Sequence, residues 1–169
     1  MSDGAEILLL AERVKKTCDK RGWTIATAES CTGGLVAASL TALAGSSDLF
    51  ECGFVTYSNL SKTDLIGVPA KLIEEKGAVS AEIALAMARG VFEHSKSQVS
   101  IAVTGIAGPT GGTKNKPVGR VHIAIGLREK SQFTQRQYDF GDIGRNAVRQ
   151  KAVEEALSFL LELLQAPGI

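Results

Sequence analysis

Nucleophilic side chains and glycines share one short segment of the chain, Thr-Ala-Glu-Ser-Cys-Thr-Gly-Gly at 27–34. We expect this segment to join a strand to a helix, because the residues before it are β-branched and those after it are small and helix-forming. Unpaired N–H groups and the helix dipole stabilise negative charge at such a helix start. Ser30 is therefore the candidate nucleophile, and the N–H groups of Thr32, Gly33 and Gly34 are the candidate oxyanion hole.

Other interpretations of this segment stay open. Serine and threonine are favoured helix N-caps, and the Glu29 carboxylate can simply bond to nearby backbone N–H groups. Cys31 is an alternative nucleophile, since a helix N-terminus lowers the pKa of a thiol. A histidine partner has little support from the sequence: His94 falls near a helix end, where we expect it to be solvated, and His122 falls inside an alternating strand on a sheet face.

A candidate base for Ser30 follows the next β-prone stretch of the chain. The segment Tyr-Ser-Asn-Leu-Ser-Lys at 57–62 follows a β-prone stretch and ends in a lysine. A lysine can act as a base when burial lowers its pKa toward neutrality. If the two strand ends are neighbours, Tyr57 and Lys62 can form a proton relay with Ser30. The alternative, which position alone favours, is a solvated lysine at the start of a helix.

A second candidate binding feature is the loop at 105–119, which holds five glycines and two of the four prolines. Glycines allow positive φ and a close approach of backbone N–H groups to a ligand, while prolines limit the conformations of the loop. Lys114 and Lys116 add positive charge, so a phosphate group is the expected ligand of this loop. The loop matches neither the P-loop pattern nor the dinucleotide-binding pattern, and a mobile surface loop remains the alternative.

The elements around these segments predict an α/β fold, specifically a three-layer α/β/α sandwich with a mixed, partly antiparallel sheet. Gly53 suggests a bulge or a close backbone approach in its strand. Asp142 is expected to open the last helix. Strands are expected at 24–28, 50–58, 99–104, 119–127 and 133–140, the last two as an antiparallel pair, and helices at 5–21, 32–44, 62–66, 69–76, 80–95 and 142–164.

Length and charge limit the functions that the chain can serve. Its 169 residues suit one domain, 1–169, and the net charge of +1 argues against nucleic-acid or membrane partners. Three widely spaced cysteines without a CxxC pair argue against disulfides and a zinc site, and suit a reducing cytoplasm. No signal peptide or membrane span is recognised. Leu8, Leu9 and the apolar last helix suggest either a subunit interface or a second core contact.

Six ordered motifs together resemble the CinA C-terminal domain family. They are AESCTGG (28–34), GFVTYSN (53–59) with Lys62, GAVS (77–80), GIAGPTGG (105–112), KPVGRV (116–121), and Gly141-Asp142 with Arg145 and Arg149. The resemblance covers residues 5–164 and points to stand-alone members that act as nicotinamide-mononucleotide deamidases. We expect no additional N-terminal domain, which longer members of the family carry.

The resemblance implies hydrolysis of the carboxamide of nicotinamide mononucleotide to nicotinic acid mononucleotide and ammonia, in pyridine nucleotide recycling. It implies a small-molecule nucleotide as substrate, no metal or other cofactor, and a homodimer or larger homo-oligomer. Ser30 matches the nucleophile, and Tyr57 and Lys62 match the residues that activate it. The other residues it places at the site are Glu12, Glu29, Thr104, Gly105, Gly108, Gly111, Gly112, Lys116 and Arg145.

The chain departs from many members of the family at two positions. Many relatives have Asp or Gly where this chain has Thr110, and Thr where it has Arg120, so the phosphate contacts are not fixed by the motifs.

The positively charged pyridinium ring of the substrate is expected to pair with Glu12 or Glu29. The rival hypotheses are a non-catalytic nucleotide-binding or regulatory module linked to competence or DNA damage, and an enzyme with the same chemistry acting on another amide.

Overall fold

The structure is a computed structural model that describes residues 3–167. Its centre is one five-stranded sheet with the strand order β2-β1-β3-β4-β5. β1 (Ile25–Glu29) is parallel to both β2 (Phe50–Val55) and β3 (Val99–Gly105). β4 (Arg120–Leu127) and β5 (Gln132–Asp139) continue the sheet in antiparallel register. The predicted mixed sheet with an antiparallel pair at its end is confirmed.

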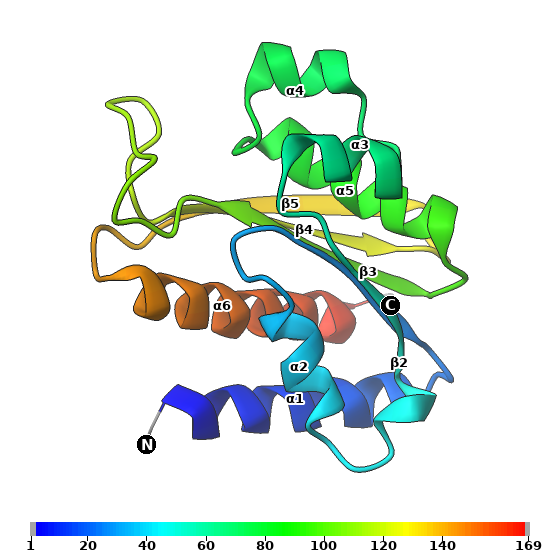
Figure 1. Cartoon of the computed structure of the whole chain (residues 1–169). Helices are drawn as coiled ribbons and strands as arrows, with labels where there is room; N and C mark the ends of the chain where they lie inside the picture. Colours follow the sequence, from blue (N-terminus) through cyan, green and yellow to red (C-terminus); the bar gives the residue numbers. More distant parts are fainter. Residues whose placement is uncertain (1–2, 168–169) are drawn as a thin grey trace.

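Helices cover both faces of this sheet (Figure 1). On one face lie α1 (Asp3–Asp19), α2 (Leu35–Thr41) and α6 (Arg145–Gln165), with α1 packed along α6 and α2. On the other face, α5 (Ala81–His94) lies against β3 and β4, with α3 (Asn59–Ile66) and α4 (Ala70–Lys76) outside it. The predicted three-layer α/β/α sandwich is therefore confirmed.

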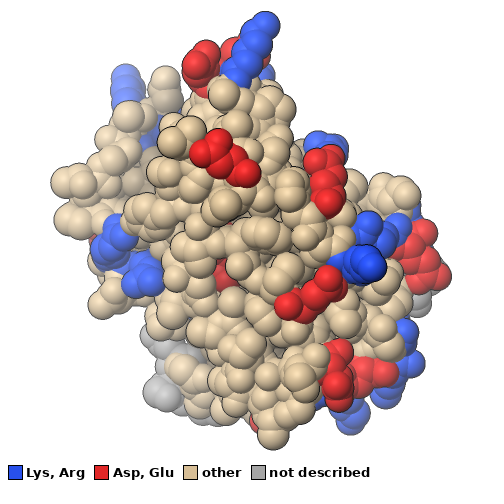
Figure 2. All heavy atoms as spheres, turned by 45° about the vertical axis from the view of Figure 1, so that its right-hand side comes forward, with Lys and Arg blue, Asp and Glu red and all other residues tan. Residues whose placement is uncertain are grey.

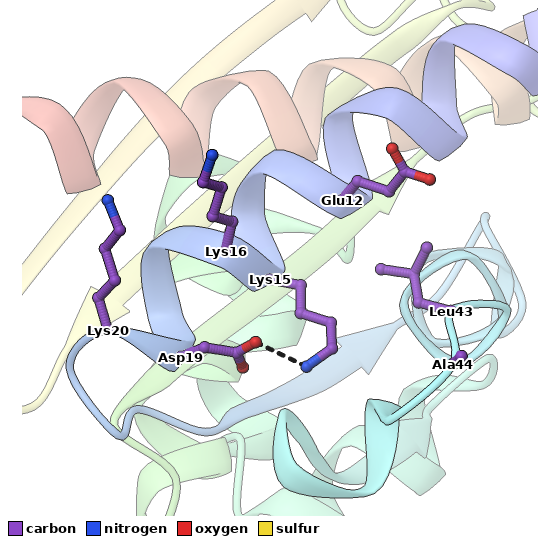
Figure 3. Close-up of a pocket in the computed structure, with 7 residues that line it drawn as sticks. All are labelled: Glu12, Lys15, Lys16, Asp19, Lys20, Leu43 and Ala44. Carbon is purple, nitrogen blue, oxygen red and sulfur yellow. Dashed lines mark hydrogen bonds and ion pairs between the residues drawn. The ribbon is translucent and has the colours of Figure 1, made fainter.

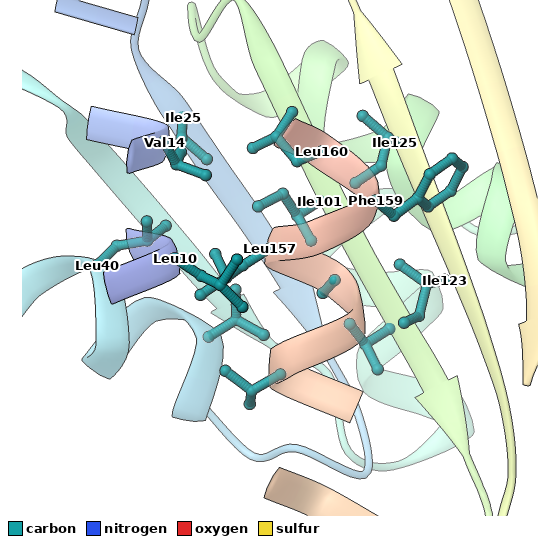
Figure 4. Close-up of a cluster of buried hydrophobic side chains, with 14 of the residues drawn as sticks. Leu10, Val14, Ile25, Leu40, Ile101, Ile123, Ile125, Leu157, Phe159 and Leu160 are labelled. Carbon is teal, nitrogen blue, oxygen red and sulfur yellow. The ribbon is translucent and has the colours of Figure 1, made fainter. Parts of the chain in front are cut away.

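Two apolar cores hold the helices to the sheet. The larger core joins α1, α2 and α6 to the sheet, with Leu157, Phe159 and Leu160 of α6 packed over Ile101, Ile123 and Ile125 (Figure 4). The smaller core lies under α5 and contains Ile83, Met87 and Val91. Burial of this kind is the main force that stabilises each layer, at roughly 25 cal/mol per Å² of apolar surface.

Several predicted boundaries need correction, and local backbone conformation explains each of them. The second helix begins at Leu35 instead of residue 32, because Gly33 and Gly34 both take positive φ. The third helix begins at Asn59, where the Ser58 hydroxyl caps the Ser61 N–H. The last helix begins at Arg145 after Gly144, so Asp142 does not open it. A short 3₁₀ turn at 46–48 was not predicted.

The exposed side chains of α1 and α6 can be compared with the predicted subunit interface. Leu8 and Leu9 are exposed, at 41% and 47%, as the helical pattern predicts. The leucines of α6, in contrast, fill the core of this same chain, so they leave no surplus apolar face there. On the face shown in Figure 2, most of the centre is uncharged with a few acidic side chains, and acidic and basic side chains are interspersed along the edges. Among the described residues, no helix is long and apolar enough to cross a membrane.

Candidate active site

The central feature of the site is a serine hydroxyl bonded to a buried lysine. Lys62 Nζ lies 3.1 Å from Ser30 Oγ, 2.8 Å from the Thr56 carbonyl oxygen and 3.5 Å from that of Tyr57. The Lys62 side chain is 1% exposed and Ser30 is 9% exposed. The predicted proximity of these two groups is therefore confirmed, and the alternative of a solvated lysine at position 62 is wrong.

The sheet brings these two side chains together. β1 and β2 are parallel neighbours, so their carboxyl ends meet at one edge of the sheet. Ser30 directly follows β1, and the Thr56 N–H donates to the Glu29 carbonyl, which extends the pairing by one residue. The chain then enters α3, whose first turn carries Lys62 back toward the end of β1. The expected close approach at Gly53 is also present, since a Cβ there would lie 2.9 Å from Thr27 Oγ1.

Burial lowers the pKa of Lys62 below its usual value of 10.5, because the low-dielectric interior disfavours the ammonium form. A neutral amine has two hydrogens and one lone pair. In the structure Lys62 Nζ donates to Ser30 Oγ and to the carbonyl oxygens of Thr56 and Tyr57. In the neutral form the two carbonyl oxygens can accept both hydrogens, and the lone pair can then accept the Ser30 hydroxyl proton. Among the described residues, no carboxylate forms an ion pair with Lys62. The surroundings therefore suit the neutral form of Lys62, which is the form that can take a proton from Ser30.

The buried carboxylate of Glu29 occupies the start of α2. Its two oxygens accept hydrogen bonds of 2.9–3.0 Å from the N–H groups of Gly34, Val36 and Ala37. This confirms the interpretation of Glu29 as a residue that bonds nearby backbone. It also corrects the idea that Glu29 faces the pyridinium ring, because the carboxylate is fully buried and already has three donors.

The predicted oxyanion donors need the same correction. The Gly34 N–H is bound by Glu29, and the Gly33 N–H donates to the Ser30 carbonyl oxygen at 3.0 Å. Thr32 is completely buried. None of these three N–H groups is therefore available to a substrate in this structure, although they lie in the predicted turn.

Cys31 does not have the properties of a nucleophile. Its thiol is buried, and burial raises its pKa to about 12, so the thiolate is scarce at neutral pH. The two histidines lie where the sequence places them. His94 is exposed in the last turn of α5, and His122 is a buried sheet residue whose Nδ1 bonds to Gln135. Ser30 therefore relies on Lys62, with no histidine bonded to it among the described residues.

Two arginines of α6 tie the site loops together. Arg145 donates to the Tyr57 hydroxyl at 2.7 Å and to the Gly108 carbonyl at 2.9 Å. Arg149 donates to the carbonyl oxygens of Cys31 and Thr32. The phenol of Tyr57 is thus bonded to Arg145, while its backbone carbonyl faces Lys62. The structure brings Tyr57, Gly108 and Arg145 into contact, as the motifs suggest, but it shows no relay from the phenol to Ser30.

The strand end and loop at 104–112 lie beside this turn. The Thr104 hydroxyl, predicted to bind substrate, is buried and donates to the Ala78 carbonyl at 2.7 Å. A Cβ on Gly105 would lie 3.1 Å from Cys31 Sγ, which places that glycine against the serine turn. The two glycines at 111 and 112 are exposed, and Gly111 has a φ of +89° that a side chain would strain. The loop is therefore ordered by close backbone packing and by its bond to Arg145.

Two predicted site residues lie elsewhere in this chain. Glu12 is exposed on α1, where it lines a hollow of about 530 Å³ with Lys16, Lys20 and other residues (Figure 3). Lys116 donates to the Lys76 carbonyl and lines a separate hollow at the start of α5. Neither Ser30 nor Lys62 lines either hollow. These placements correct the expectation that Glu12 and Lys116 lie around the Ser30 hydroxyl within one chain.

Sequence reasoning missed two groups that organise the site. The Thr56 carbonyl, which accepts from Lys62, gives no side-chain signal in the sequence. Arg149 appears in the motifs, but only the folded chain shows that it bonds to the serine turn. A helical spacing of four residues from Arg145 was the available signal, since side chains four apart share one helix face.

Proteins of known sequence match this chain over most of its length. A CinA-like protein of Geotalea daltonii is 54% identical over 150 residues, which are 88% of this chain and 35% of that protein. The nicotinamide-nucleotide amidohydrolase PncC of Escherichia coli K12 is 43% identical over 156 residues, which are 92% of this chain and 93% of that protein. The chain thus spans about a third of the CinA-like relatives and nearly all of PncC.

Solved structures agree with these sequence relatives. The crystal structure of the competence/damage inducible protein CihA from Agrobacterium tumefaciens superposes with a TM-score of 0.92 at 44% identity, covering 95% of this chain and 96% of that one. The family model described as the CinA C-terminal domain matches residues 8–164, which include Ser30, Lys62 and both arginines. The chain therefore belongs to the CinA C-terminal domain family.

Proposed function

We propose that this protein is an amidohydrolase that converts nicotinamide mononucleotide and water to nicotinic acid mononucleotide and ammonia. The observation that carries the proposal is the 3.1 Å contact between Ser30 Oγ and the buried Lys62 Nζ. A relative that matches over nearly its whole length is named a nicotinamide-nucleotide amidohydrolase. An amide is a poor electrophile, so its hydrolysis needs an activated nucleophile of this kind.

In the first half of the reaction, neutral Lys62 takes the hydroxyl proton of Ser30 as Oγ bonds to the carboxamide carbon. Negative charge then develops on the carboxamide oxygen, and a hydrogen-bond donor beside Ser30 must stabilise it. When the carbon–nitrogen bond breaks, Lys62 returns its proton to the departing nitrogen, which leaves as ammonia. The product of this half is an ester between the Ser30 hydroxyl and the pyridine carboxyl group.

In the second half, a water molecule attacks the ester carbon and gives one proton to Lys62. The ester bond breaks, Ser30 Oγ regains that proton, and nicotinic acid mononucleotide is released. The base therefore ends each half in its neutral form. This cycle requires Lys62 to hold a proton only transiently, which is what burial without a carboxylate partner favours.

The phosphate of the substrate is assigned to the Arg145 side of the site. Arg145 is an exposed guanidinium whose two bonds go to neutral oxygens, those of Tyr57 and Gly108. A guanidinium in this state can exchange a neutral acceptor for the stronger, charge-assisted bonds of a phosphate.

The reaction as proposed takes place in the cytoplasm, uses no cofactor, and is carried out by a homo-oligomer.

Release of ammonia from nicotinamide mononucleotide by the purified protein tests this function directly. The S30A variant should lose at least a thousandfold in turnover, while a Ser39→Ala variant should keep it. Ser39 is a matched control, because its hydroxyl donates to the Leu35 carbonyl within α2, away from the Ser30–Lys62 pair. Equal turnover by S30A and the parent protein would refute the mechanism.

Substrate comparison separates this function from its rivals. Nicotinamide mononucleotide should be hydrolysed faster than nicotinamide riboside and free nicotinamide, because only the first offers a phosphate to Arg145. Faster turnover of free nicotinamide would indicate the same chemistry on another amide. Absence of ammonia from all three would favour the non-catalytic, regulatory alternative.

A further inference from the structure

Three of the five main-chain N–H groups at 30–34 donate to other residues. The Ser30 N–H donates to the Val103 carbonyl at 2.9 Å, and the Gly33 N–H closes the turn onto the Ser30 carbonyl. The Gly34 N–H is bound by Glu29. Within residues 3–167, the N–H groups of Cys31 and Thr32 are the two in this turn that donate to no other residue.

Position in the turn favours the first of these two donors. Thr32 has no exposed surface, whereas Cys31 keeps 5% of its surface exposed and directly follows the nucleophile. The Cys31 N–H also lies near its own sulfur, which is a weak acceptor while the thiol keeps its proton. In strand-to-helix turns that carry a nucleophilic serine, the N–H of the next residue commonly faces the oxyanion.

The direction of this N–H is fixed by the rest of the turn. The C=O and N–H of a trans peptide point in opposite directions. Because the Ser30 carbonyl points into the turn toward Gly33, the Cys31 N–H points out of it. Arg149 holds the next two carbonyls, those of Cys31 and Thr32, at 3.2 and 3.1 Å. The peptide planes on both sides of Cys31 are therefore held in place before a substrate arrives.

We propose that the main-chain N–H of Cys31 is the oxyanion donor of this site, and that Arg149 is a positioning residue that holds the turn in the conformation that presents it. This inference rests on the proposed amidohydrolase function and specifies its electrostatic part. It replaces Thr32, Gly33 and Gly34, whose N–H groups are inaccessible or already bonded.

The first test compares two substitutions of the same residue. C31A removes the thiol and keeps the N–H, whereas C31P removes both. Proline suits the second position of a turn, so we expect C31P to fold, and thermal unfolding checks this. The expected result is a kcat for C31P about 10²–10³ below that of C31A, the usual effect of one oxyanion donor. A ratio below fivefold, with both variants folded, would overturn the inference.

A second test covers the case in which C31P does not fold. Arg149→Met should lower kcat by at least tenfold with little change in KM, and Arg149→Lys should restore part of it. The acidic limb of the pH–rate profile, which reports Lys62, should stay where it is in the parent protein. If Arg149 had a merely structural role, its substitution would lower the melting temperature and the fraction of active protein, but kcat per active site would be unchanged. That result would overturn the positioning role of Arg149.

A tetrahedral probe separates this inference from the substrate assignment. Pyridine-3-boronic acid can form a tetrahedral adduct with a serine hydroxyl, with a boron-bound oxygen in the oxyanion position. Its affinity should fall from C31A to C31P, and from the parent protein to Arg149→Met, by a factor similar to the loss of kcat. If the parent protein bound the boronate in this pattern but released no ammonia from the nucleotide, the donor would stand and the proposed substrate would fail. If C31A and C31P bound the boronate equally, Cys31 could not be the oxyanion donor. If C31P does not fold, equal affinity in the parent protein and in Arg149→Met would refute the proposal instead.

Discussion

Replacing Lys62 by methionine should change how the stability of the protein depends on pH. Lys62 is 1% exposed, and burial lowers its pKa from 10.5. Between the folded-state pKa and 10.5, the unfolded chain therefore binds more protons at this residue than the folded chain does. The free energy of unfolding then rises with pH across that interval, by up to about 1.4 kcal/mol per pH unit for one proton. Below the folded-state pKa this contribution is flat.

The K62M variant lacks this proton, so its stability should lack the same rise. Methionine also leaves the carbonyls of Thr56 and Tyr57 without their Lys62 donor, which costs about 1 kcal/mol for a typical hydrogen bond. That loss is independent of pH, and it offsets part of the gain from removing a buried amine. The slope against pH, and not the stability at one pH, is therefore the quantity that tests the argument.

Urea unfolding at pH values from 6 to 10 measures the slope. We expect the stability of the parent protein to gain on that of K62M as pH rises, and K62M to be inactive throughout. Lys71→Met is the matched control, because the Lys71 side chain is 86% exposed and its substitution should leave the slope unchanged. Parallel stability curves for the parent protein and K62M would show that Lys62 keeps an ordinary pKa, and would remove it as a neutral base.

Three further predictions follow from the same contacts. Glu29→Gln should lower the free energy of unfolding by roughly 1–3 kcal/mol in urea titration, because a carboxylate that accepts three N–H bonds becomes an amide whose NH₂ group cannot accept; an unchanged midpoint would contradict the capping role. Tyr57→Phe should lower kcat by less than tenfold in the ammonia assay, because the phenol bonds to Arg145 and not to Ser30. A loss of a hundredfold or more would show that the Tyr57 phenol belongs to the proton relay. Iodoacetamide at pH 8 should label Cys52 before Cys18 and Cys31 by mass spectrometry, because those two thiols are buried with pKa values of about 12, and rapid labelling of Cys31 would contradict its burial.

The sequence predicts the sheet and the serine–lysine pair because both depend on strong local signals. Alternating and continuous apolar runs locate the strands, and residues that follow two parallel strands must meet at one edge. The oxyanion donors could not be predicted in the same way. Their availability depends on which N–H groups other atoms take first, and the bonds from Gly34 to Glu29 and from Gly33 to Ser30 exist only in the folded turn.

Helix boundaries and side-chain partners illustrate the same limit. Gly33 and Gly34 were expected to present oxyanion donors at a helix that begins at residue 32, but their positive φ values delay the start of α2 until Leu35. The leucines of α6 were assigned to either an interface or the core, and only the packing against β3 and β4 shows that they fill the core. A helical pattern indicates which face is apolar, but not what covers it.

The buried lysine connects the stability of the fold to its chemistry. A neutral amine in the interior avoids the large cost of a buried charge, yet it still lacks the packing of an apolar side chain. The same burial favours the neutral amine that can take a proton from Ser30, and the hydrogen bonds from Lys62 Nζ to the carbonyls of Thr56 and Tyr57 hold the amino group beside Ser30 Oγ. Any opening of α3 would hydrate Lys62, raise its pKa and return it to the ammonium form, which has no lone pair to accept a proton. Activity should therefore fall with local unfolding of 59–66 before the sheet unfolds, so that kcat declines at a lower urea concentration than the far-ultraviolet circular dichroism does.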